Sequence, residues 1–374
     1  MVAPPGRCPQ GDLATIALME NGRQLDLLEP WAIGGVEIPT RLVLAPMAGV
    51  SVQAFRRQGR RFGAGLVCSE MVSVAGIRHR NERTLGYLRV ASDEHPLAIQ
   101  IFGSEPGAMA EAARMVEAAG ADIVDINFGC PVKKVTKTGA GASLLDDPGH
   151  AARIVEAVAG ATALPVSVKM RRGTDNGSRA CLEVGPLLVR AGAASLTLHP
   201  RSARQMYTGT ADHSLTAELV SLVDVPVVAS GDIISRARAQ AVLATTGAAA
   251  VMVGRAAQGN PWALAEIMGG PGEPSREEVV AELLLFMRET VRELGEQRAT
   301  SFLKKFYGWY LGRGRFPRPF KQELVMLPTL EAVETRLLAA APGASDVLER
   351  LETDLGDVDE VLLDSLPISI YGGG

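Results

Sequence analysis

Short apolar runs alternate with longer segments of helical period along most of the chain. Each run has four to six residues and precedes a segment in which apolar residues recur every three or four positions, the patterns of a buried strand and an amphipathic helix. Several helical segments end in Gly-Ala just before the next run, as at Gly120, Gly192 and Gly247, and glycine commonly follows a helix end. The runs predict eight strands, at residues 42–46, 66–69, 97–102, 123–127, 166–170, 195–199, 225–230 and 249–254.

Eight strand-then-helix units within about 230 residues predict an α/β fold, a closed (β/α)8 TIM barrel at residues 34–270. An open, doubly wound parallel sheet is the alternative that the same alternation allows. A Gly- and Pro-rich run at residues 269–274 ends the pattern, and no strand is predicted after it. The later segments have helical period and predict a small helical domain at residues 275–343.

The two terminal regions differ in composition from the barrel. Residues 1–33 contain Pro and Gly with weak periodicity, and they predict an N-terminal extension or a first hairpin that covers the barrel. Residues 344–374 hold eight acids and one base, and they predict an acidic tail that begins as a helix and ends in disorder. Because this tail is so acidic, the formal net charge of −4 conceals a net positive charge on the rest of the chain.

The sequence shows no signal for a membrane, a disulfide or a metal. No stretch reaches about 18 uninterrupted apolar residues, and the first residues lack the parts of a leader peptide, so we expect a soluble, cytoplasmic protein. Cys8, Cys68, Cys130 and Cys181 are scattered, without a Cys-x-x-Cys pair or histidines at zinc-ligand spacing. We therefore expect neither disulfides nor a bound metal.

Polar residues cluster where the predicted strands end. In a (β/α)8 barrel the carboxyl ends of the strands form the face that carries the active site. A purely structural barrel has no reason to place polar groups at almost every one of these ends. The strand ends contain Pro46-Met47-Ala48, Ser69-Glu70, Gln100, Asn127 with Cys130, Lys169 with Arg171, His199 with Arg201, Ser230-Gly231-Asp232, and Gly254-Arg255.

Five of these positions suggest ligand chemistry. Turns at Gly231 and Gly254 follow the last two strands, where barrels bind phosphate, and Arg255 adds a bidentate donor; tight turns that need glycine are the alternative. Lys169 lies in an otherwise apolar strand and could neutralise an anionic ring, form a Schiff base or make an internal ion pair. Gln100 could read a carbonyl and ring N–H pair, or be a core amide satisfied by backbone.

Cys130 lies in a predicted loop, where a thiol can react rather than only pack. An inert, buried cysteine is the alternative. Lys133, Lys134 and Lys137 follow within seven residues. Their charge is expected to favour the thiolate and to attract anions.

Residues 298–321 contain seven bases, seven aromatics and no acids. Bases bind phosphates and exposed aromatic rings stack on nucleobases, so this stretch predicts RNA binding. The alternative is a helical core of aromatics with a solvated basic face. Arg56, Arg57, Arg60 and Arg61 either extend this basic track or form an exposed helix face.

Linked motifs occupy the strand ends between residues 41 and 262. They are Ala45-Pro46-Met47-Ala48-Gly49, Ser69-Glu70-Met71, Asp125-Ile126-Asn127-Phe128-Gly129-Cys130-Pro131 with Lys133-Lys134-Val135, Gly139 through Leu145, Ser230-Gly231-Asp232-Ile233, and Gly254-Arg255-Ala256-Ala257. In these motifs the sequence resembles the FMN-dependent tRNA-dihydrouridine synthase family, closest to its bacterial B-type branch. The similarity is weaker through the predicted helical domain. The Cys130 segment and Pro46-Met47 are the most specific motifs.

The resemblance implies an enzyme that reduces tRNA uridines, with FMN at the barrel mouth and NADPH as electron donor. It implies that reduced flavin delivers hydride to uracil C6, that Cys130 donates a proton to C5, and that Lys169 balances charge on the flavin. It assigns contacts with the uracil to Asn127 and Arg201. It assigns cofactor contacts to Pro46, Met47, Ala48, Gln100, Lys169, His199, Ser230, Gly231, Asp232, Gly254 and Arg255.

The tRNA outside the target nucleotide also needs a binding surface, because the uridine must leave its stack to react. We expect the protein to act as a monomer. The residues predicted to hold the tRNA are Lys133, Lys134, Arg298, Lys304, Lys305, Arg313 and Arg315.

Two positions depart from the family pattern. Ser230 stands where relatives commonly have Asn, and Pro200 stands between His199 and Arg201 where the B-type branch often has Gly. The sequence is also compatible with two alternative functions. One is a flavin-free barrel aldolase with Lys169 as Schiff-base nucleophile, and the other is a non-catalytic RNA-binding protein.

Overall fold

The computed structural model describes residues 25–355. Residues 1–24 and 356–374 hold the first part of the predicted extension and the later part of the predicted acidic tail, and these predictions lie outside the described residues. Within residues 25–355, no helix is both long enough and apolar enough to cross a membrane.

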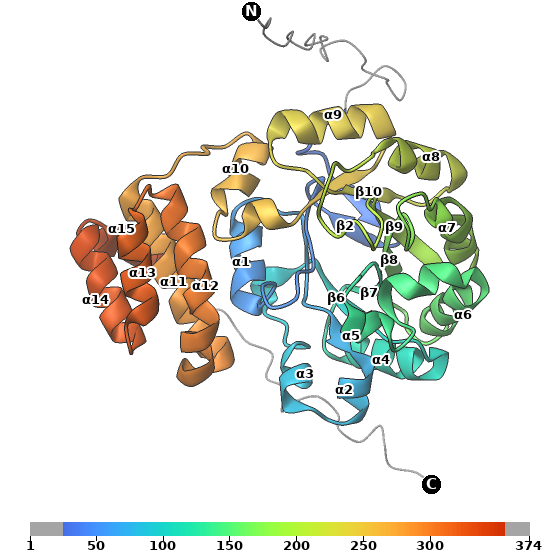
Figure 1. Cartoon of the computed structure of the whole chain (residues 1–374), viewed down its shortest axis with the longest axis horizontal. Coiled ribbons are helices and arrows are strands. Elements are labelled where there is room, and N and C mark those ends of the chain that lie inside the picture. The colour runs from blue at the N-terminus through green and yellow to red at the C-terminus, as the bar shows by residue number, and fades with distance from the viewer. Residues whose placement is uncertain (1–24, 356–374) are drawn as a thin grey trace, which may run out of the picture.

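Eight parallel strands close into a barrel, which confirms the predicted fold class and excludes the open sheet (Figure 1). The closing pairs join β11 to β3, β3 to β4, and β4 to β6. The short strand β5 (Val72–Ser73), which the pattern did not predict, pairs with the carboxyl end of β6. The barrel strands are β3 (Leu42–Leu44), β4 (Leu66–Cys68), β6 (Leu97–Phe102), β7 (Ile123–Phe128), β8 (Val166–Arg171), β9 (Ala193–His199), β10 (Val227–Ser230) and β11 (Ala250–Val253).

Amphipathic helices surround the barrel and cover the outward faces of its strands (Figure 1). The strands are apolar on this face as well as inside, as is typical of a parallel sheet that is buried on both sides. Short helices occupy several loops at the carboxyl ends. The surrounding helices are α1 (Gln53–Arg61), α4 (Pro106–Ala118), α6 (Pro148–Ala159), α7 (Ala180–Arg190), α8 (Ser214–Leu222), α9 (Arg236–Thr246) and α10 (Trp262–Met268), and the loop helices are α2 (Val74–Arg78), α3 (Glu82–Gly86) and α5 (Lys133–Thr136).

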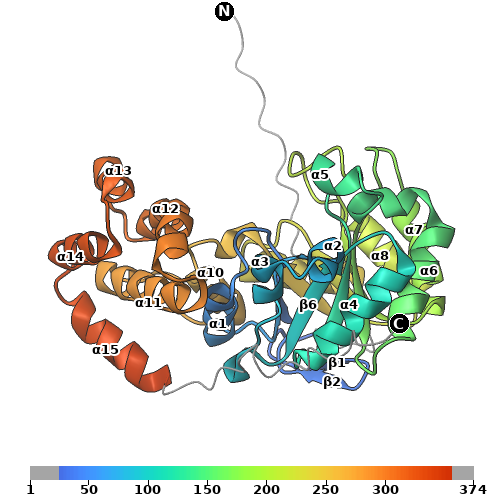
Figure 2. The ribbon, with the colours of Figure 1, turned by 90° about the horizontal axis from the view of Figure 1, so that it is seen from below.

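A hairpin plugs the amino-terminal end of the barrel. Strands β1 (Trp31–Ile33) and β2 (Val36–Ile38) pair in antiparallel fashion, and Trp31 joins an apolar cluster with inward-facing residues such as Val43. This hairpin is the covering element that the sequence allowed, although it extends past residue 33. Figure 2 shows it at the end of the barrel opposite α5. The carboxyl ends of the strands therefore form the open face.

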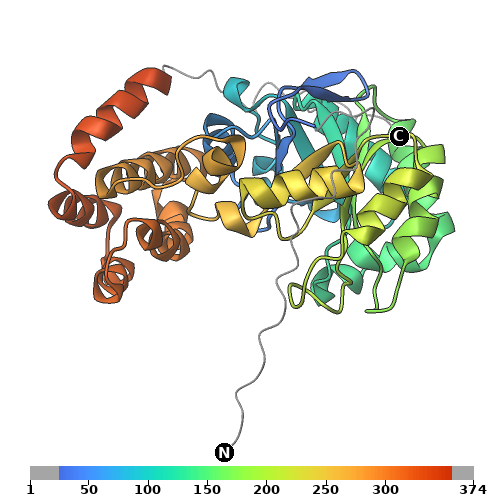
Figure 3. The ribbon, with the colours of Figure 1, turned by 90° about the horizontal axis from the view of Figure 1, so that it is seen from above.

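Five helices follow the barrel and pack together at its flank (Figure 3). The last of them packs against α11, with Leu348 buried and an ion pair between Glu352 and Arg288 at 2.6 Å. The sequence placed residues 344–355 in a tail outside the helical domain, but their apolar stripe joins them to it. The five helices are α11 (Arg276–Leu294), α12 (Glu296–Arg313), α13 (Arg318–Met326), α14 (Leu330–Ala340) and α15 (Ala344–Leu355).

Both interpretations of the arginines in α1 are wrong, because this helix lies between the barrel and the helical domain. Arg57 is 7% exposed and lies 3.0 Å from Glu289 of α11. Arg61 lies 2.5 Å from Glu282 of the same helix. The acids come from a distant part of the sequence, so α1 alone could not reveal its buried face.

The other two arginines of α1 are also occupied within the protein. Arg56 is 2% exposed and pairs with Glu94 at 3.1 Å. Arg60 donates hydrogen bonds to the carbonyl oxygens of Ala64 and Gly65 at 2.6 and 2.7 Å. The four guanidinium groups therefore stabilise the fold and do not extend a track for RNA.

Candidate active site

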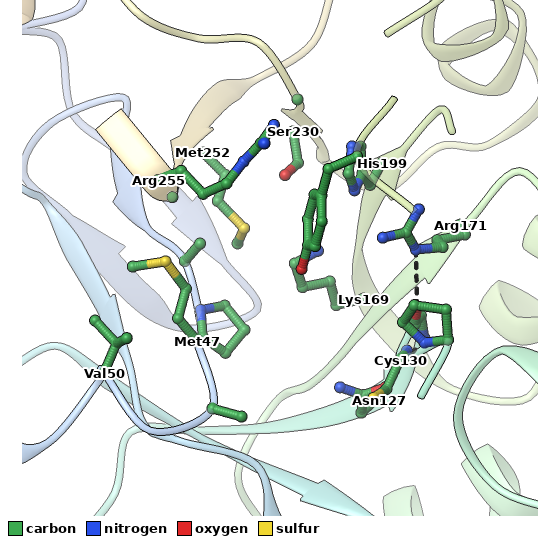
Figure 4. Close-up of a pocket in the computed structure, with 18 of the residues that line it drawn as sticks. Met47, Val50, Asn127, Cys130, Lys169, Arg171, His199, Ser230, Met252 and Arg255 are labelled. Atoms are coloured by element: carbon green, nitrogen blue, oxygen red, sulfur yellow. Dashed lines mark hydrogen bonds between the residues drawn. The ribbon is translucent and has the colours of Figure 1, made fainter. Parts of the chain in front are cut away.

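A cavity of about 570 Å³ opens at the carboxyl ends of the barrel strands (Figure 4). Its lining includes every residue that the resemblance assigned to the cofactor, together with Asn127 and Cys130. Figure 4 shows Cys130 and Asn127 on one wall, and Ser230 and Arg255 on another. The predicted cofactor residues that meet here are Pro46, Met47, Ala48, Gln100, Lys169, His199, Ser230, Gly231, Asp232, Gly254 and Arg255.

Lys169 brings an unpaired positive charge into this cavity. Its ammonium group makes no hydrogen bond or ion pair within residues 25–355, so the internal ion-pair interpretation is wrong. Burial, and then the positive charge of Arg171, lower the pKa of Lys169 to about 8. The Lys169 side chain is half-buried, and a cation that is partly removed from water without a partner is costly. The cavity is therefore suited to a ligand that carries negative charge.

Arg171 and Tyr207 also line the cavity, and sequence reasoning assigned neither a role. The Tyr207 ring lies between two cations, with the guanidinium carbons of Arg255 and Arg171 at 4.5 and 5.6 Å from its centroid. Arg171 also donates to the carbonyl oxygen of Gly129 at 3.0 Å. Tyr207 could have been predicted as a cavity residue from the sequence, because it is an aromatic residue in the polar loop that follows a barrel strand. Further lining residues that were not predicted are Val50, Met71, Met206, Met252 and Gln258.

His199 and Arg201 follow one another at the end of β9 but have different surroundings. Burial, and then the charge of Lys169, lower the pKa of His199 to about 2, so a neutral imidazole lines the cavity. Arg201 is 2% exposed and is not part of the lining. Its guanidinium donates to the Asp232 carboxylate at 2.8 Å and to two carbonyl oxygens of its own loop. The structure thus places Arg201 behind the wall, where it ties together the loops after β9 and β10.

The turn after β10 presents its backbone to the cavity. Gly231 has a φ of +114°, and a Cβ there would lie 2.8 Å from the His199 ring and 2.9 Å from Ala211. The Asp232 carboxylate accepts a hydrogen bond from the Ala211 N–H at 2.8 Å. Burial acts to raise the pKa of Asp232, but the hydrogen bond from Arg201 and this N–H outweigh it and lower the pKa. The close approach explains why glycine is needed at position 231.

The turn after β11 is less crowded. A Cβ at Gly254 would make ordinary contacts, the nearest with Ala45 at 3.5 Å, so space alone does not require glycine there. Arg255 begins a short 3₁₀ helix (Arg255–Ala257) and is exposed. Within the part of the chain that the structure describes, its guanidinium has no carboxylate partner, which leaves it available to an anion.

Cys130 is half-buried in the cavity wall. Its N–H donates to Asn127 Oδ1 at 2.8 Å, and its carbonyl oxygen accepts from the Ala142 N–H at 3.1 Å. Burial raises the pKa of the thiol, although the nearby Arg171 and Lys169 act to lower it. The expected thiolate is therefore wrong, and the thiol keeps its proton at neutral pH.

The lysines after Cys130 lie outside this cavity. Lys133 and Lys137 are exposed. Lys134 lines a neighbouring cavity of about 1020 Å³, which shares Met71 with the first cavity. The charges that act on the thiol come from Arg171 and Lys169 rather than from these lysines.

Gln100 and Asn127 line the cavity, but their amides bond within the wall. Asn127 Nδ2 donates to Gln100 Oε1 at 2.7 Å, and Gln100 Nε2 donates to Asp125 Oδ2 at 2.6 Å. Gln100 is thus a satisfied amide, although side chains rather than backbone satisfy it. Asn127 Oδ1 accepts from the N–H groups of Gly129 and Cys130. Both amides therefore support the loop that carries the thiol.

The predicted RNA-binding bases do not share one surface. Lys304 and Lys305 of α12 line a groove of about 490 Å³ with Arg318 and Lys321 of α13. Lys305 also donates to the carbonyl oxygen of Gly49, in the loop after β3, which brings this groove next to the barrel mouth. The four bases form the basic groove of the helical domain.

The remaining predicted bases lie elsewhere. Arg298 is exposed on α12 outside the basic groove. Arg313 donates to the Gly272 carbonyl oxygen at 2.5 Å, and Arg315 lies 3.8 Å from Glu273, so both face the linker before α11. Most aromatics of the segment form the helical core, as the alternative interpretation held. The buried ones are Phe306, Tyr307, Tyr310, Phe316 and Phe320.

The fold and the site together define a barrel enzyme whose open face gathers a protonated thiol, an unpaired lysine and a glycine turn. A family model described as "Dihydrouridine synthase (Dus)" matches residues 43–341. The chain belongs to the dihydrouridine synthase family. Within residues 25–355, no group of His, Cys, Asp and Glu side chains is arranged to hold a metal ion.

Named relatives cover most of the chain. The tRNA-dihydrouridine synthase B of Pseudomonas aeruginosa is 39% identical over 308 residues, 80% of this chain and 92% of the relative. A probable tRNA-dihydrouridine synthase of Rhodobacter capsulatus is 39% identical over 294 residues, 75% of this chain and 88% of the relative. Several relatives carry the B-type name, which supports the predicted branch.

Solved structures share the barrel. The chain resembles histamine dehydrogenase from Rhizobium sp. 4-9 with a TM-score of 0.54 at 13% identity, over 70% of this chain and 50% of that one. It resembles morphinone reductase with a TM-score of 0.50 at 17% identity, over 67% of this chain and 91% of that one. At these identities the likeness shows the common fold alone.

Proposed function

We propose that this protein reduces the C5–C6 double bond of specific uridines in tRNA, with bound FMN as cofactor and NADPH as electron donor. Family membership and the names of the relatives support this reaction. The observation that carries the proposal is the meeting of a protonated Cys130 and an unpaired Lys169 in one cavity at the barrel mouth.

The residues of the cavity fit FMN, which carries a phosphate and gains negative charge on its ring when reduced. Lys169 offers an uncompensated positive charge to the ring. Gly231, Gly254 and Arg255 lie after the last two strands, where barrels commonly bind phosphate. We assign the remaining cofactor contacts to Pro46, Met47, Ala48, Gln100, His199, Ser230 and Asp232.

When bound and reduced, FMN supplies the hydride that adds to uracil C6. Cys130 completes the reduction by donating its proton to C5 as a general acid. Its raised pKa suits this role, since a thiolate would have no proton to donate. The positive charges of Arg171 and Lys169 stabilise the thiolate that remains. We assign the uracil contact to Asn127, because it lines the cavity, whereas Arg201 lies behind the wall with its guanidinium bonded to Asp232 and to its own loop.

The tRNA outside the target uridine is assigned to the basic groove of the helical domain. Lys304, Lys305, Arg318 and Lys321 supply charge for phosphates, and Lys305 joins the groove to the barrel mouth. The exposed side chains of Lys133, Lys134 and Arg298 extend the same function. Arg313 and Arg315 contribute less, because they face the linker.

The enzyme is proposed to act as a monomer in the cytoplasm and without a bound metal. Light scattering coupled to size-exclusion chromatography, and metal analysis of the active protein, check the first and last of these points. Family membership favours the flavin enzyme over the aldolase and the non-catalytic RNA-binding protein. If borohydride traps a carbonyl substrate on Lys169, the aldolase would be the better assignment.

The test begins with the absorption spectrum of the purified protein. The protein is then incubated with NADPH and tRNA that lacks dihydrouridine, and its nucleosides are analysed by mass spectrometry. We expect a flavin spectrum and the formation of dihydrouridine that depends on NADPH. A protein that neither contains nor binds FMN would overturn the cofactor assignment. If NADPH reduces the bound flavin but no dihydrouridine is formed, the assignment of tRNA as the substrate is wrong.

A further inference from the structure

Asp125 lies on β7, two residues before Asn127, and its side chain is not part of the cavity lining. It is 4% exposed, and its carboxylate accepts hydrogen bonds from Ser167 Oγ and Gln100 Nε2, each at 2.6 Å. From Gln100 the hydrogen bonds continue through Asn127 to the backbone of the Cys130 loop. A buried carboxylate is thus connected to the thiol loop through two amide side chains.

All bonds of this chain run in one direction, and the carboxylate sets that direction. A carboxylate only accepts, whereas a Gln or Asn amide can present either its oxygen or its NH2 group in nearly the same shape. Because Asp125 accepts, Gln100 turns its NH2 group toward it and its oxygen toward Asn127. Asn127 then turns its own NH2 group toward Gln100 and its oxygen toward the loop.

The loop depends on that oxygen. The N–H groups of Gly129 and Cys130 both donate to Asn127 Oδ1, at 3.1 and 2.8 Å. The carbonyl oxygens of the same two residues are held from elsewhere, by Arg171 and by the Ala142 N–H. If Asn127 were reversed, its NH2 group would face two donors in a buried place, where unpaired polar groups are costly.

We propose that Asp125 is a positioning residue, which holds Cys130 at the cavity by fixing the direction of the Gln100 and Asn127 amides. The proposal rests on the proposed function only in taking the thiol as the proton donor. The directional chain itself belongs to the folded protein without cofactor or RNA. It also explains why an acidic residue lies inside an apolar strand.

Two variants at position 100 break the chain in different ways. In Gln100→Glu, an acceptor faces the Asp125 acceptor. In Gln100→Met, the net charge and the side-chain length are kept, but both bonds are lost. Adding Asp125→Asn to Gln100→Glu supplies an NH2 group that can donate to the new carboxylate. The second oxygen of that carboxylate can accept from Asn127, so the double variant restores the direction of the Asn127 amide and the net charge, although the bond between positions 100 and 125 is reversed.

The readouts are made on FMN-free protein without RNA. Hydrogen exchange of the peptide that contains residues 129 and 130, and the rate at which iodoacetamide alkylates Cys130, are followed by mass spectrometry. We expect Gln100→Glu and Gln100→Met to speed this exchange about tenfold and to speed alkylation several-fold, since one hydrogen bond to the loop is weakened. The double variant should return to within about twofold of wild type.

If exchange and alkylation are faster in the double variant than in Gln100→Glu, the proposal is overturned. Two unrelated defects would add, whereas restoring the amide direction should slow both reactions again. Wild-type exchange in Gln100→Met would overturn it as well. If Gln100→Glu does not fold, recovery of folding in the double variant gives the same supporting result. Asp125→Asn alone should be mild, because its oxygen can accept from Gln100 while its NH2 group donates to Ser167.

Failure of this proposal can be told from failure of the proposed function. Dihydrouridine formation is measured separately on FMN-loaded protein. If the double variant restores wild-type exchange but the wild-type enzyme makes no dihydrouridine, the proposed function is wrong and the positioning role stands. If the wild type makes dihydrouridine but Gln100→Met leaves exchange unchanged, the positioning role is wrong and the proposed function stands.

Discussion

Two regions of this molecule bury positive charge in opposite ways. Between α1 and the helical domain, Arg57 and Arg61 bind Glu289 and Glu282 at 3.0 and 2.5 Å. At the barrel mouth, Lys169 has no such partner within residues 25–355. In the first region the protein compensates its own charges. In the second region the described residues provide no such compensation, which is consistent with the proposed anionic ligand.

The pKa shifts express the same difference. Burial acts to lower the pKa of Arg57, but Glu289 and Asp93 outweigh burial and the pKa rises. No acid compensates the burial of Lys169 to this extent, and its pKa falls to about 8. Burial alone therefore does not separate a structural charge from a functional one. The presence or absence of a partner does.

The largest expected effect is on activity at the mouth. Cys130→Ala should lower dihydrouridine formation by about 100-fold or more, because a positioned general acid is lost. The thermal midpoint should hardly change, since the thiol is half-buried and lines a cavity. Cys181→Ala is the matched control, because that residue is fully buried in α7 and should lose stability but not activity. A Cys130→Ala enzyme with full turnover would exclude the proton-donor role.

The next effect contrasts two cations directly. Arg57→Met leaves Glu289 buried without its partner, and we expect a loss of about 3–5 kcal/mol in the free energy of unfolding. Lys169→Met removes a charge that has no partner, so stability should be unchanged or higher while FMN affinity falls at least about tenfold. Urea denaturation and FMN titration measure the two quantities. Equal destabilisation by both substitutions would contradict the comparison.

The pH dependence of stability should distinguish a charge with a partner from one without. Burial raises the pKa of Glu94, the partner of Arg56, from 4.5 to about 7, and lowers that of Lys169 from 10.5 to about 8. Between about pH 4.5 and 7 the folded protein holds a proton on Glu94 that the unfolded chain has lost, so Glu94 contributes a fall in stability as pH rises; His199, whose folded-state pKa is about 2, contributes the opposite change below about pH 6.5. Between about pH 8 and 10.5 the unfolded chain holds a proton on Lys169 that the folded protein has lost, so Lys169 contributes a rise in stability with pH, which Cys181 opposes above about pH 9 because burial raises its pKa to about 11.

Variants assign each pH window to its residue. Relative to wild type, Glu94→Gln should gain stability as pH rises from about 4.5 to 7, whereas Lys169→Met should lose stability as pH rises from about 8 to 10.5. Each change in the difference from wild type should amount to about 2 kcal/mol or more across its window. Urea denaturation of wild type and variants at several pH values measures both. A Lys169→Met protein whose difference from wild type stays constant through the alkaline window would show that Lys169 does not titrate there.

The smallest effect concerns exposed charge. Lys304→Ala should weaken tRNA binding a few-fold and lower the salt dependence by about one phosphate contact. Arg315→Ala removes the same charge from a side chain that faces the linker, so binding should change less. Filter binding at several salt concentrations compares the two. Equal losses would mean that the tRNA path includes the linker side of the helical domain.

Local pattern was sufficient for most of the barrel. The run at residues 123–127 became β7, and the Gly-Ala pairs mark the entry to several strands. Because parallel strands bring their carboxyl ends to one face, Gln100, Lys169 and Gly231 could be predicted to meet. The apolar stripe of residues 344–355 was harder to interpret, since acidic composition obscured its packing on α11.

Arg201 has a position that the strand pattern predicts and contacts that it does not. It follows β9 by two residues, as a cavity residue would, but its side chain turns back to Asp232 and to its own loop. Spacing along a strand predicts which end a residue occupies. It does not predict where a long, flexible side chain finds its acceptors in the loop beyond.

Neighbouring residues suffice to predict the periodicity of strands and helices, the polar strand ends and the presence of Cys130 among them. Contacts between distant segments set which buried charges have partners and which way the buried amides point. Arg61 and Glu282 are 221 residues apart in the chain. Hydrogen bonds and ion pairs are short-ranged and directional, so only the folded chain could show that Arg61 has an acid beside it and Lys169 has none.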